Sequence, residues 1–135
     1  MPYPLARIGG IGRKHVEALA AVGVRTTDDL LDAAARPKGR AALSEQTGIA
    51  EDTLLDWANR ADLLRIAGLS AELAVLLGAA GVTTVPALKR QRPGALAVAL
   101  QAANARRRLV ARVPGEAQCA KLIAAAKGLR RRLSY

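Results

Sequence analysis

Arginines gather in two dense runs near the end of this 135-residue chain. Guanidinium groups bind phosphate and carboxylate oxygens through paired hydrogen bonds, so such runs favour contact with a polyanion. The two runs are made up of Arg106, Arg107, Arg108 and Arg112, and of Arg130, Arg131 and Arg132.

The positive charge is confined to one part of the chain. Residues 1–88 hold nine Lys or Arg and ten Asp or Glu, whereas residues 89–135 hold twelve Lys or Arg and only Glu116. The net charge of +10 therefore comes from the last third. This asymmetry predicts a polyanionic partner there, with DNA or RNA ahead of an acidic protein or a lipid surface. A solvated helix face is the alternative interpretation.

Composition excludes several classes of protein. The chain has no Phe, two Tyr and one Trp, which argues against the aromatic platforms that stack unpaired bases and favours a duplex backbone as ligand. One Cys and one His cannot form a disulfide or an ordinary zinc site, so we expect no metal and no cofactor. The single Cys, the lack of a signal-peptide pattern and the lack of a membrane span predict a cytoplasmic protein.

The sequence contains an internal repeat at an offset of 58 residues. Residues 8–30 and 66–88 share eight of 23 positions, and the shared positions are glycines, apolar residues and one threonine. In each copy a Gly-containing turn leads into an apolar-periodic helix, which a further glycine ends. Those stops are Gly23 and Gly81, and we expect Thr26 or Thr27 to cap the next helix in copy one and Thr84 to cap it in copy two.

The helical periodicity predicts an all-α fold, a compact bundle of about eight short helices. Their predicted ranges are 13–21, 27–35, 38–47, 51–64, 71–79, 85–91, 94–108 and 116–130. Trp57 shares the apolar face of the fourth helix, which predicts a core position. We expect a body over residues 1–113, and a basic C-terminal helix and tail over 114–135 that pack on or extend from the same domain. The tail is predicted to fray from Gly128.

The start of each repeat, apolar, any residue, Gly, apolar, Gly and then a helix, resembles the helix-hairpin-helix family. Ile8, Gly10, Ile11 and Gly12 carry this pattern in copy one. In copy two only Ile66, Gly68 and Leu69 match. More widely, the stretches IGGIGRKHVEALAAVGVRTTDDLL, ARPKGRAALSEQTGIAEDTLLDWANRADLLRIAGLS and RRRLVARVPGEAQCAKLI resemble a bacterial family of uncharacterised domains with two such units in tandem.

This resemblance implies phosphate binding at the first hairpin. Helix-hairpin-helix units hold DNA by backbone amides at the hairpin and the next helix N-terminus, which reads no base sequence. Glycine permits the close approach of the phosphate, and cations surround the turn. The candidate residues are Arg7, Gly10, Ile11, Gly12, Arg13 and Lys14, to which the two arginine runs add further phosphate contacts. A tight turn with solvated cations is the alternative.

The second hairpin departs from the pattern. Ser70 replaces the second glycine and is predicted to cap the next helix, while Ala71 and Glu72 replace the two cations. We therefore expect a structural role for it. The first hairpin in turn lacks a preceding helix, and we hypothesise that the C-terminal helix fills that place and brings the arginines 130–132 near Arg7.

No constellation of catalytic residues emerges, so we expect no enzyme. His15 is predicted to lie at the surface or its boundary, and Cys119 to be a small buried residue. Asp28, Asp29 and Asp32 are predicted to cap a helix start rather than to bind a metal.

Two functions remain. The first is non-enzymatic, sequence-independent binding of nucleic acid, with DNA preferred over RNA. The alternative is a protein-interaction or scaffold module whose basic C-terminal third docks an acidic partner.

Overall fold

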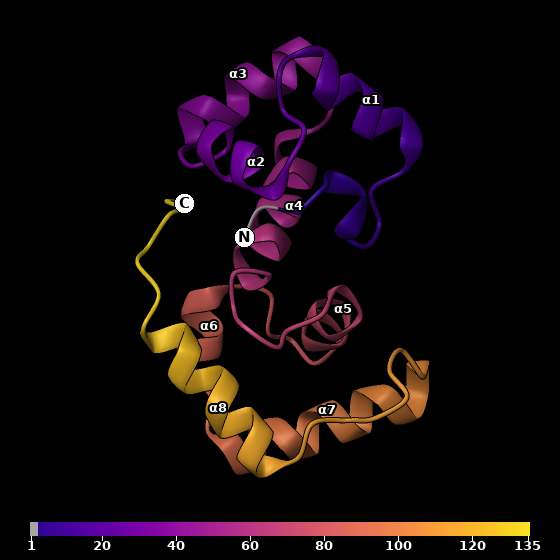
Figure 1. Cartoon of the computed structure of the whole chain (residues 1–135), viewed down its shortest axis with the longest axis vertical. Helices are drawn as coiled ribbons and strands as arrows, with labels where there is room; N and C mark the ends of the chain where they lie inside the picture. The colour runs from indigo at the N-terminus through magenta and orange to yellow at the C-terminus, as the bar shows by residue number, and fades with distance from the viewer. Residues whose placement is uncertain (1–2) are drawn as a thin grey trace. The chain divides into compact units, whose positions relative to one another are not determined.

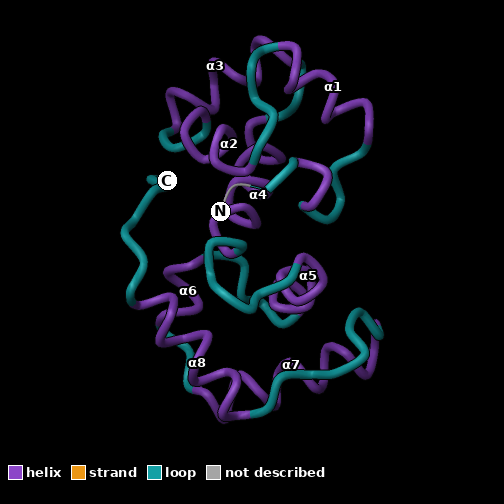
Figure 2. The backbone as a smooth tube through the Cα atoms, in the orientation of Figure 1, coloured by secondary structure: helices purple, strands orange, loops and turns teal. Residues whose placement is uncertain are grey.

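A computed structural model describes residues 3–135 as helices joined by short loops (Figures 1 and 2). The elements follow the predicted all-α order closely. They are the 3-10 turn η1 (Leu5–Arg7) and the helices α1 (Arg13–Ala21), α2 (Thr27–Ala33), α3 (Pro37–Thr47), α4 (Glu51–Leu63), α5 (Ala71–Ala79), α6 (Val85–Lys89), α7 (Pro93–Arg107) and α8 (Glu116–Lys127).

The chain divides into two units. The first unit holds the described residues up to Asp62 together with Arg131–Tyr135, and the second holds Leu63–Arg130. The boundary expected at residue 113 thus falls within the second unit, in the loop between α7 and α8.

Local signals explain where the helices begin and end. Thr26 accepts a hydrogen bond from the Asp29 amide, and Thr84 accepts one from the Ala87 amide, which confirms both caps. Gly23 and Gly81 follow the ends of α1 and α5 with φ of 87° and 89°, a conformation that favours glycine. The two segments aligned by the sequence therefore adopt the same conformation at these positions. That they form one repeated unit stays a prediction.

Each unit has its own apolar core. In the first unit, Leu19 and Leu30 are fully buried and Trp57 is 5% exposed, as its helical face predicts. In the second unit, α8 packs on α6 and α7, and Leu88 and Leu100 are fully buried. Burying one Leu side chain contributes roughly 1.5–3 kcal/mol, so these faces hold the helices of each unit together.

The C-terminal tail is fixed in place, and the prediction that it frays is wrong for residues 131–135. Leu133 is buried, the Ser134 amide donates to the Ala35 carbonyl at 2.8 Å, and the Tyr135 hydroxyl donates to Asn59 Oδ1 at 2.8 Å. Burial raises the pKa of the Tyr135 phenol above its ordinary value.

None of the helices over residues 3–135 combines the length and the apolar character that crossing a membrane requires.

Candidate nucleic-acid interface

The first hairpin, residues 8–12, places a glycine-rich turn directly before a helix. Ile8 is buried and anchors the turn, whereas Gly10 and Gly12 are exposed. Gly10 has φ +91°, so a side chain there would strain the backbone. Gly12 is the N-cap of α1 with extended angles, and nothing lies within 4 Å of where its Cβ would be. The surface at Gly12 is therefore open to a ligand.

The helix that follows this hairpin begins without a side-chain cap. Its first turn leaves backbone amides without intrahelical partners. The His15 and Val16 amides both donate to the Gly12 carbonyl at 3.1 Å, whereas the Arg13 and Lys14 amides have no acceptor within residues 3–135. Two donors thus remain at the positive end of the α1 dipole, where an anion is favoured.

The three predicted cations all lie exposed around this turn, but two have neighbours. Arg7 stacks over the Tyr3 ring, with its guanidinium carbon 4.9 Å from the ring centroid. Arg13 pairs with Glu17 at 3.3 Å across an exposed helical turn, an interaction worth only a few tenths of a kcal/mol. Both arginines can therefore turn toward a phosphate at small cost.

The sequence analysis missed one residue that contacts this hairpin, Arg60 of α4. From α4, its Nη1 donates a hydrogen bond to the Gly9 carbonyl and lies 2.7 Å from where a Cβ on Gly10 would be. This hydrogen bond brings α4 into contact with the hairpin. That the C-terminal helix fills the place of a helix before the hairpin stays a prediction, since α8 belongs to the second unit and the hairpin to the first. Gly9 and Arg60 are separated by 51 positions in the sequence, which explains why no local pattern indicated this contact.

The second hairpin, residues 66–70, has the same backbone turn but a different surface. Gly68 has φ +84°, close to the value at Gly10. The Ser70 side chain accepts from the Leu73 amide at 3.1 Å, which confirms the predicted cap. The Ser70 hydroxyl thus satisfies the Leu73 amide, as the Gly12 carbonyl satisfies the His15 amide in the first hairpin. The difference is the added hydroxyl and the negative charge of Glu72 in the first turn.

This second hairpin borders a cavity of about 590 Å³. The cavity lies between the start of α5 and the loop between α7 and α8, and carries both Glu72 and Arg112 on its walls. Because this cavity carries both charges, it does not favour an anion, whereas the basic residues Arg7, Arg13 and Lys14 lie at or beside the first hairpin.

The first arginine run belongs to the second unit. Arg106 and Arg107 end α7, Arg108 takes a left-handed conformation with φ 49°, and Arg112 lies in the loop that follows. All four are exposed, and none forms an ion pair with another described residue. The Asn104 side chain holds this loop by donating to the Val110 carbonyl and accepting from the Val110 amide, each at 3.0 Å.

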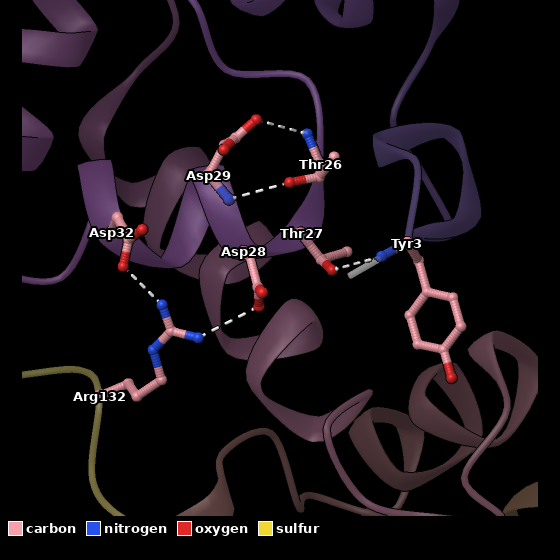
Figure 3. A network of polar contacts seen from close by, with 7 residues as sticks. All are labelled: Tyr3, Thr26, Thr27, Asp28, Asp29, Asp32 and Arg132. Carbon is pink, nitrogen blue, oxygen red and sulfur yellow. Dashed lines mark hydrogen bonds and ion pairs between the residues drawn. The ribbon is translucent and has the colours of Figure 1, made fainter. Parts of the chain in front are cut away.

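The second arginine run is split by its contacts. Arg132 pairs with Asp28 at 3.2 Å and with Asp32 at 2.5 Å, so two carboxylates of α2 already neutralise it (Figure 3). Arg131 Nε donates to the Leu133 carbonyl at 2.9 Å. Arg130 is exposed and lies in the second unit. Of the three arginines, only Arg132 is therefore neutralised by carboxylates within the described residues.

The start of α2 also holds the N-terminal segment (Figure 3). The Tyr3 amide donates to Thr27 Oγ1 at 3.0 Å, and the Thr27 amide donates to the Tyr3 carbonyl at 2.8 Å. Asp29 accepts from the amides of Arg25 and Thr26, and the first of these hydrogen bonds contributes most to lowering its pKa. Asp29 therefore caps α2, as the sequence predicts, whereas Asp28 and Asp32 form ion pairs with Arg132.

The two residues set aside earlier lie where they were predicted. His15 is exposed, and its ring centroid lies 5.3 Å from that of Trp57. Cys119 is fully buried, and burial raises the pKa of its thiol, which disfavours the reactive thiolate.

The two units differ sharply in charge. The first holds ten Lys or Arg and nine Asp or Glu, whereas the second holds eleven Lys or Arg and two Glu. The first hairpin, which matches the helix-hairpin-helix pattern more fully, therefore lies in a nearly neutral unit, and most of the excess positive charge lies in the second unit.

Comparison with known proteins places the chain in an uncharacterised family. A family model described as a domain of unknown function, DUF4332, matches residues 9–129. The chain therefore belongs to this family, as the resemblance to a family of uncharacterised domains implied. Searches of curated proteins and of solved structures found no match.

Proposed function

We propose that this protein binds nucleic acid through the backbone and without reading base sequence, with duplex DNA as the preferred ligand. The first hairpin would act as a helix-hairpin-helix turn that takes one phosphate. The exposed arginines of the second unit would neutralise further phosphates. No catalytic step is part of this proposal.

The observation that carries the proposal is the start of α1, where unpaired amides and exposed cations occur together. The Arg13 and Lys14 amides have no acceptor within residues 3–135, and the exposed Arg7, Arg13 and Lys14 lie in or next to this turn in the sequence. Backbone amides at a helix N-terminus together with basic side chains are a common way to bind a phosphate group.

The charge of the second unit supports the same ligand. Its excess of nine positive charges includes Arg106, Arg107, Arg108 and Arg112, which have no anionic partner in the described part of the chain. Counterion release from DNA on contact with such groups supplies a free energy that does not depend on sequence. Arg132 contributes less, because Asp28 and Asp32 compete for it.

The competing function is a protein-interaction module. The observation that favours it is the second hairpin, where Ser70 and Glu72 disfavour a phosphate. In that case the basic second unit would dock an acidic protein partner and would bind a duplex poorly at physiological salt.

Fluorescence anisotropy with a labelled duplex of a few helical turns tests the proposal. With about four phosphates engaged, we expect the logarithm of the binding constant to fall with the logarithm of salt concentration at a slope of about −3.6. Two duplexes of unrelated sequence should bind equally. An Arg106→Gln/Arg107→Gln variant should bind both more weakly, with a shallower slope. Absence of binding even at low salt would overturn the proposal and favour the protein-interaction module.

A further inference from the structure

Arg60 is the one side chain from another helix that bonds to the backbone of the first hairpin within the described residues. It is half-buried and extends from α4 to the Gly9 carbonyl. A guanidinium has five N–H donors in a planar fork, and a single carbonyl engages only part of them. The guanidinium thus brings a positive charge and further donors to the Gly9–Gly10 part of the turn.

The contact also accounts for a glycine. A Cβ on Gly10 would lie 2.7 Å from Arg60 Nη1 and 3.9 Å from its Cζ. Gly68, at the matching position of the second hairpin, has no comparable neighbour, since only the Gln118 Nε2 approaches, at 3.9 Å. Gly10 thus has a positive φ that favours glycine, and a side chain there would also displace the flexible end of Arg60.

We infer that Arg60 positions the first hairpin for an anion and supplies a fourth cationic group to it. The inference rests on the function proposed above and assigns that site a residue from α4. By binding the Gly9 carbonyl, Arg60 turns the negative end of that peptide group toward itself and away from the ligand. Its fixed charge then adds to those of Arg7, Arg13 and Lys14, which lie exposed on the turn.

The second hairpin shows what the turn is like without such a residue. The position 58 residues after Arg60 is Gln118, which has no charge, and it is this side chain that lies nearest Gly68. Both hairpins therefore have a polar side chain at the glycine with positive φ, and only the first has a cation there.

The test compares Arg60→Gln with Arg60→Lys and with a matched control, Arg36→Gln. Arg36 is an exposed arginine of the same unit at the start of α3, and its side chain makes no capping bond. Binding of a labelled duplex is measured over a series of salt concentrations, and thermal unfolding verifies that each variant is folded.

We expect Arg60→Gln to weaken duplex binding about tenfold at 0.1 M salt and to make the salt slope shallower by about 0.9, the value for one lost phosphate contact. Arg60→Lys keeps the charge and should recover the wild-type slope, with affinity between those of Arg60→Gln and the wild type, because Lys lacks the planar fork. A purely structural role would lower the unfolding temperature and leave the slope unchanged.

Two outcomes would overturn the inference, and they are distinguishable. If the wild type binds and Arg60→Gln behaves like Arg36→Gln, or keeps the wild-type slope, Arg60 is no part of the site while the proposed function stands. If the wild type binds no duplex at any salt concentration, the proposed function and the inference fail together.

Discussion

The two hairpins of this chain share a backbone turn and differ in almost everything that a ligand would meet. Gly10 and Gly68 have φ of 91° and 84°, and both turns lead into a nine-residue helix. The first helix start has glycine as its N-cap and cations beside it, whereas the second has serine and a glutamate. A shared backbone geometry therefore does not by itself make a phosphate site. The first two amides of each helix lack an acceptor among the described residues, so the side chains at these three positions set the charge and the capping group that a phosphate would meet there.

Exchanging those three positions should have the largest effect. Gly12→Ser/Arg13→Ala/Lys14→Glu gives the first hairpin the residues of the second. The introduced serine should accept an amide hydrogen bond, and the change removes two cations and adds an anion. Loss of about two phosphate contacts should weaken duplex binding about fiftyfold at 0.1 M salt, or about 2.3 kcal/mol.

The same variant separates binding from folding. Serine is at least as good an N-cap as glycine, so the unfolding temperature should stay the same or rise. Anisotropy and thermal unfolding of one preparation measure both effects. Equal duplex affinity of the variant and the wild type would contradict a site at the first hairpin.

Alanine at the two equivalent glycines should destabilise the chain by different amounts. Gly68→Ala meets only the cost of a positive φ, about 1 kcal/mol. Gly10→Ala has the same strain and also displaces Arg60, so we expect about 2 kcal/mol. Chemical denaturation measures both, with Gly12→Ala as the unstrained control. Equal losses at Gly10 and Gly68 would indicate that the Arg60 contact contributes nothing to stability.

A smaller effect is expected in the tail. Arg132→Ala removes ion pairs to Asp28 and Asp32, of which Asp32 is 76% exposed, so the free energy of unfolding should fall by about 1 kcal/mol. Arg130→Ala, at an exposed position, should leave stability unchanged. If binding depends on the first hairpin and the second unit, Arg132→Ala should lower duplex affinity less than Arg106→Gln/Arg107→Gln. The reverse order would assign the binding to the tail.

The smallest expected effect is on how the free energy of unfolding depends on pH in the acidic range. The pKa of Asp29 is lowered in the folded chain, chiefly by the hydrogen bond from the Arg25 amide. The ionised Asp29 carboxylate therefore stabilises the folded chain at pH values above 3.8, the ordinary pKa of this group. That contribution is lost as pH falls through the lowered folded pKa. The position equivalent to Asp29 is Ala87 at the Thr84 cap, which has no such dependence. Asp29→Asn should make unfolding slightly less sensitive to pH below about 4, whereas Ala87→Ser should not. Unfolding curves between pH 2 and 6 measure the difference.

Much of the fold could be predicted from local signals. Helix starts and ends follow from short-range chemistry: Thr26 and Thr84 as caps, Gly23 and Gly81 as stops, and Pro37 and Pro93 in first turns. These interactions span a few residues, so sequence spacing determines them.

Long-range contacts could not be predicted in the same way. The tail contacts join Arg132 to Asp28 and Tyr135 to Asn59 across 104 and 76 residues, and neither pair belongs to a periodic pattern. The contact of Arg60 with the Gly9 carbonyl could not be predicted either, because the sequence of α4 shows only the pattern of an ordinary amphipathic helix. The turn residues of the candidate site could therefore be predicted from the sequence, whereas the hydrogen bond from α4 to this turn could not.

Amide chemical shifts offer the most direct test of the difference between the hairpins. A ¹H–¹⁵N correlation spectrum of the full chain, titrated with a short unlabelled duplex at low salt, observes both turns in one sample. We predict the largest shifts at the amides of Gly10, Gly12, Arg13 and Lys14, and smaller ones at Ala71 and at Gly68 and Ser70, which share a cavity with Arg112. Larger shifts at the second hairpin than at the first, or no shift at the first hairpin while the duplex binds elsewhere, would contradict the account.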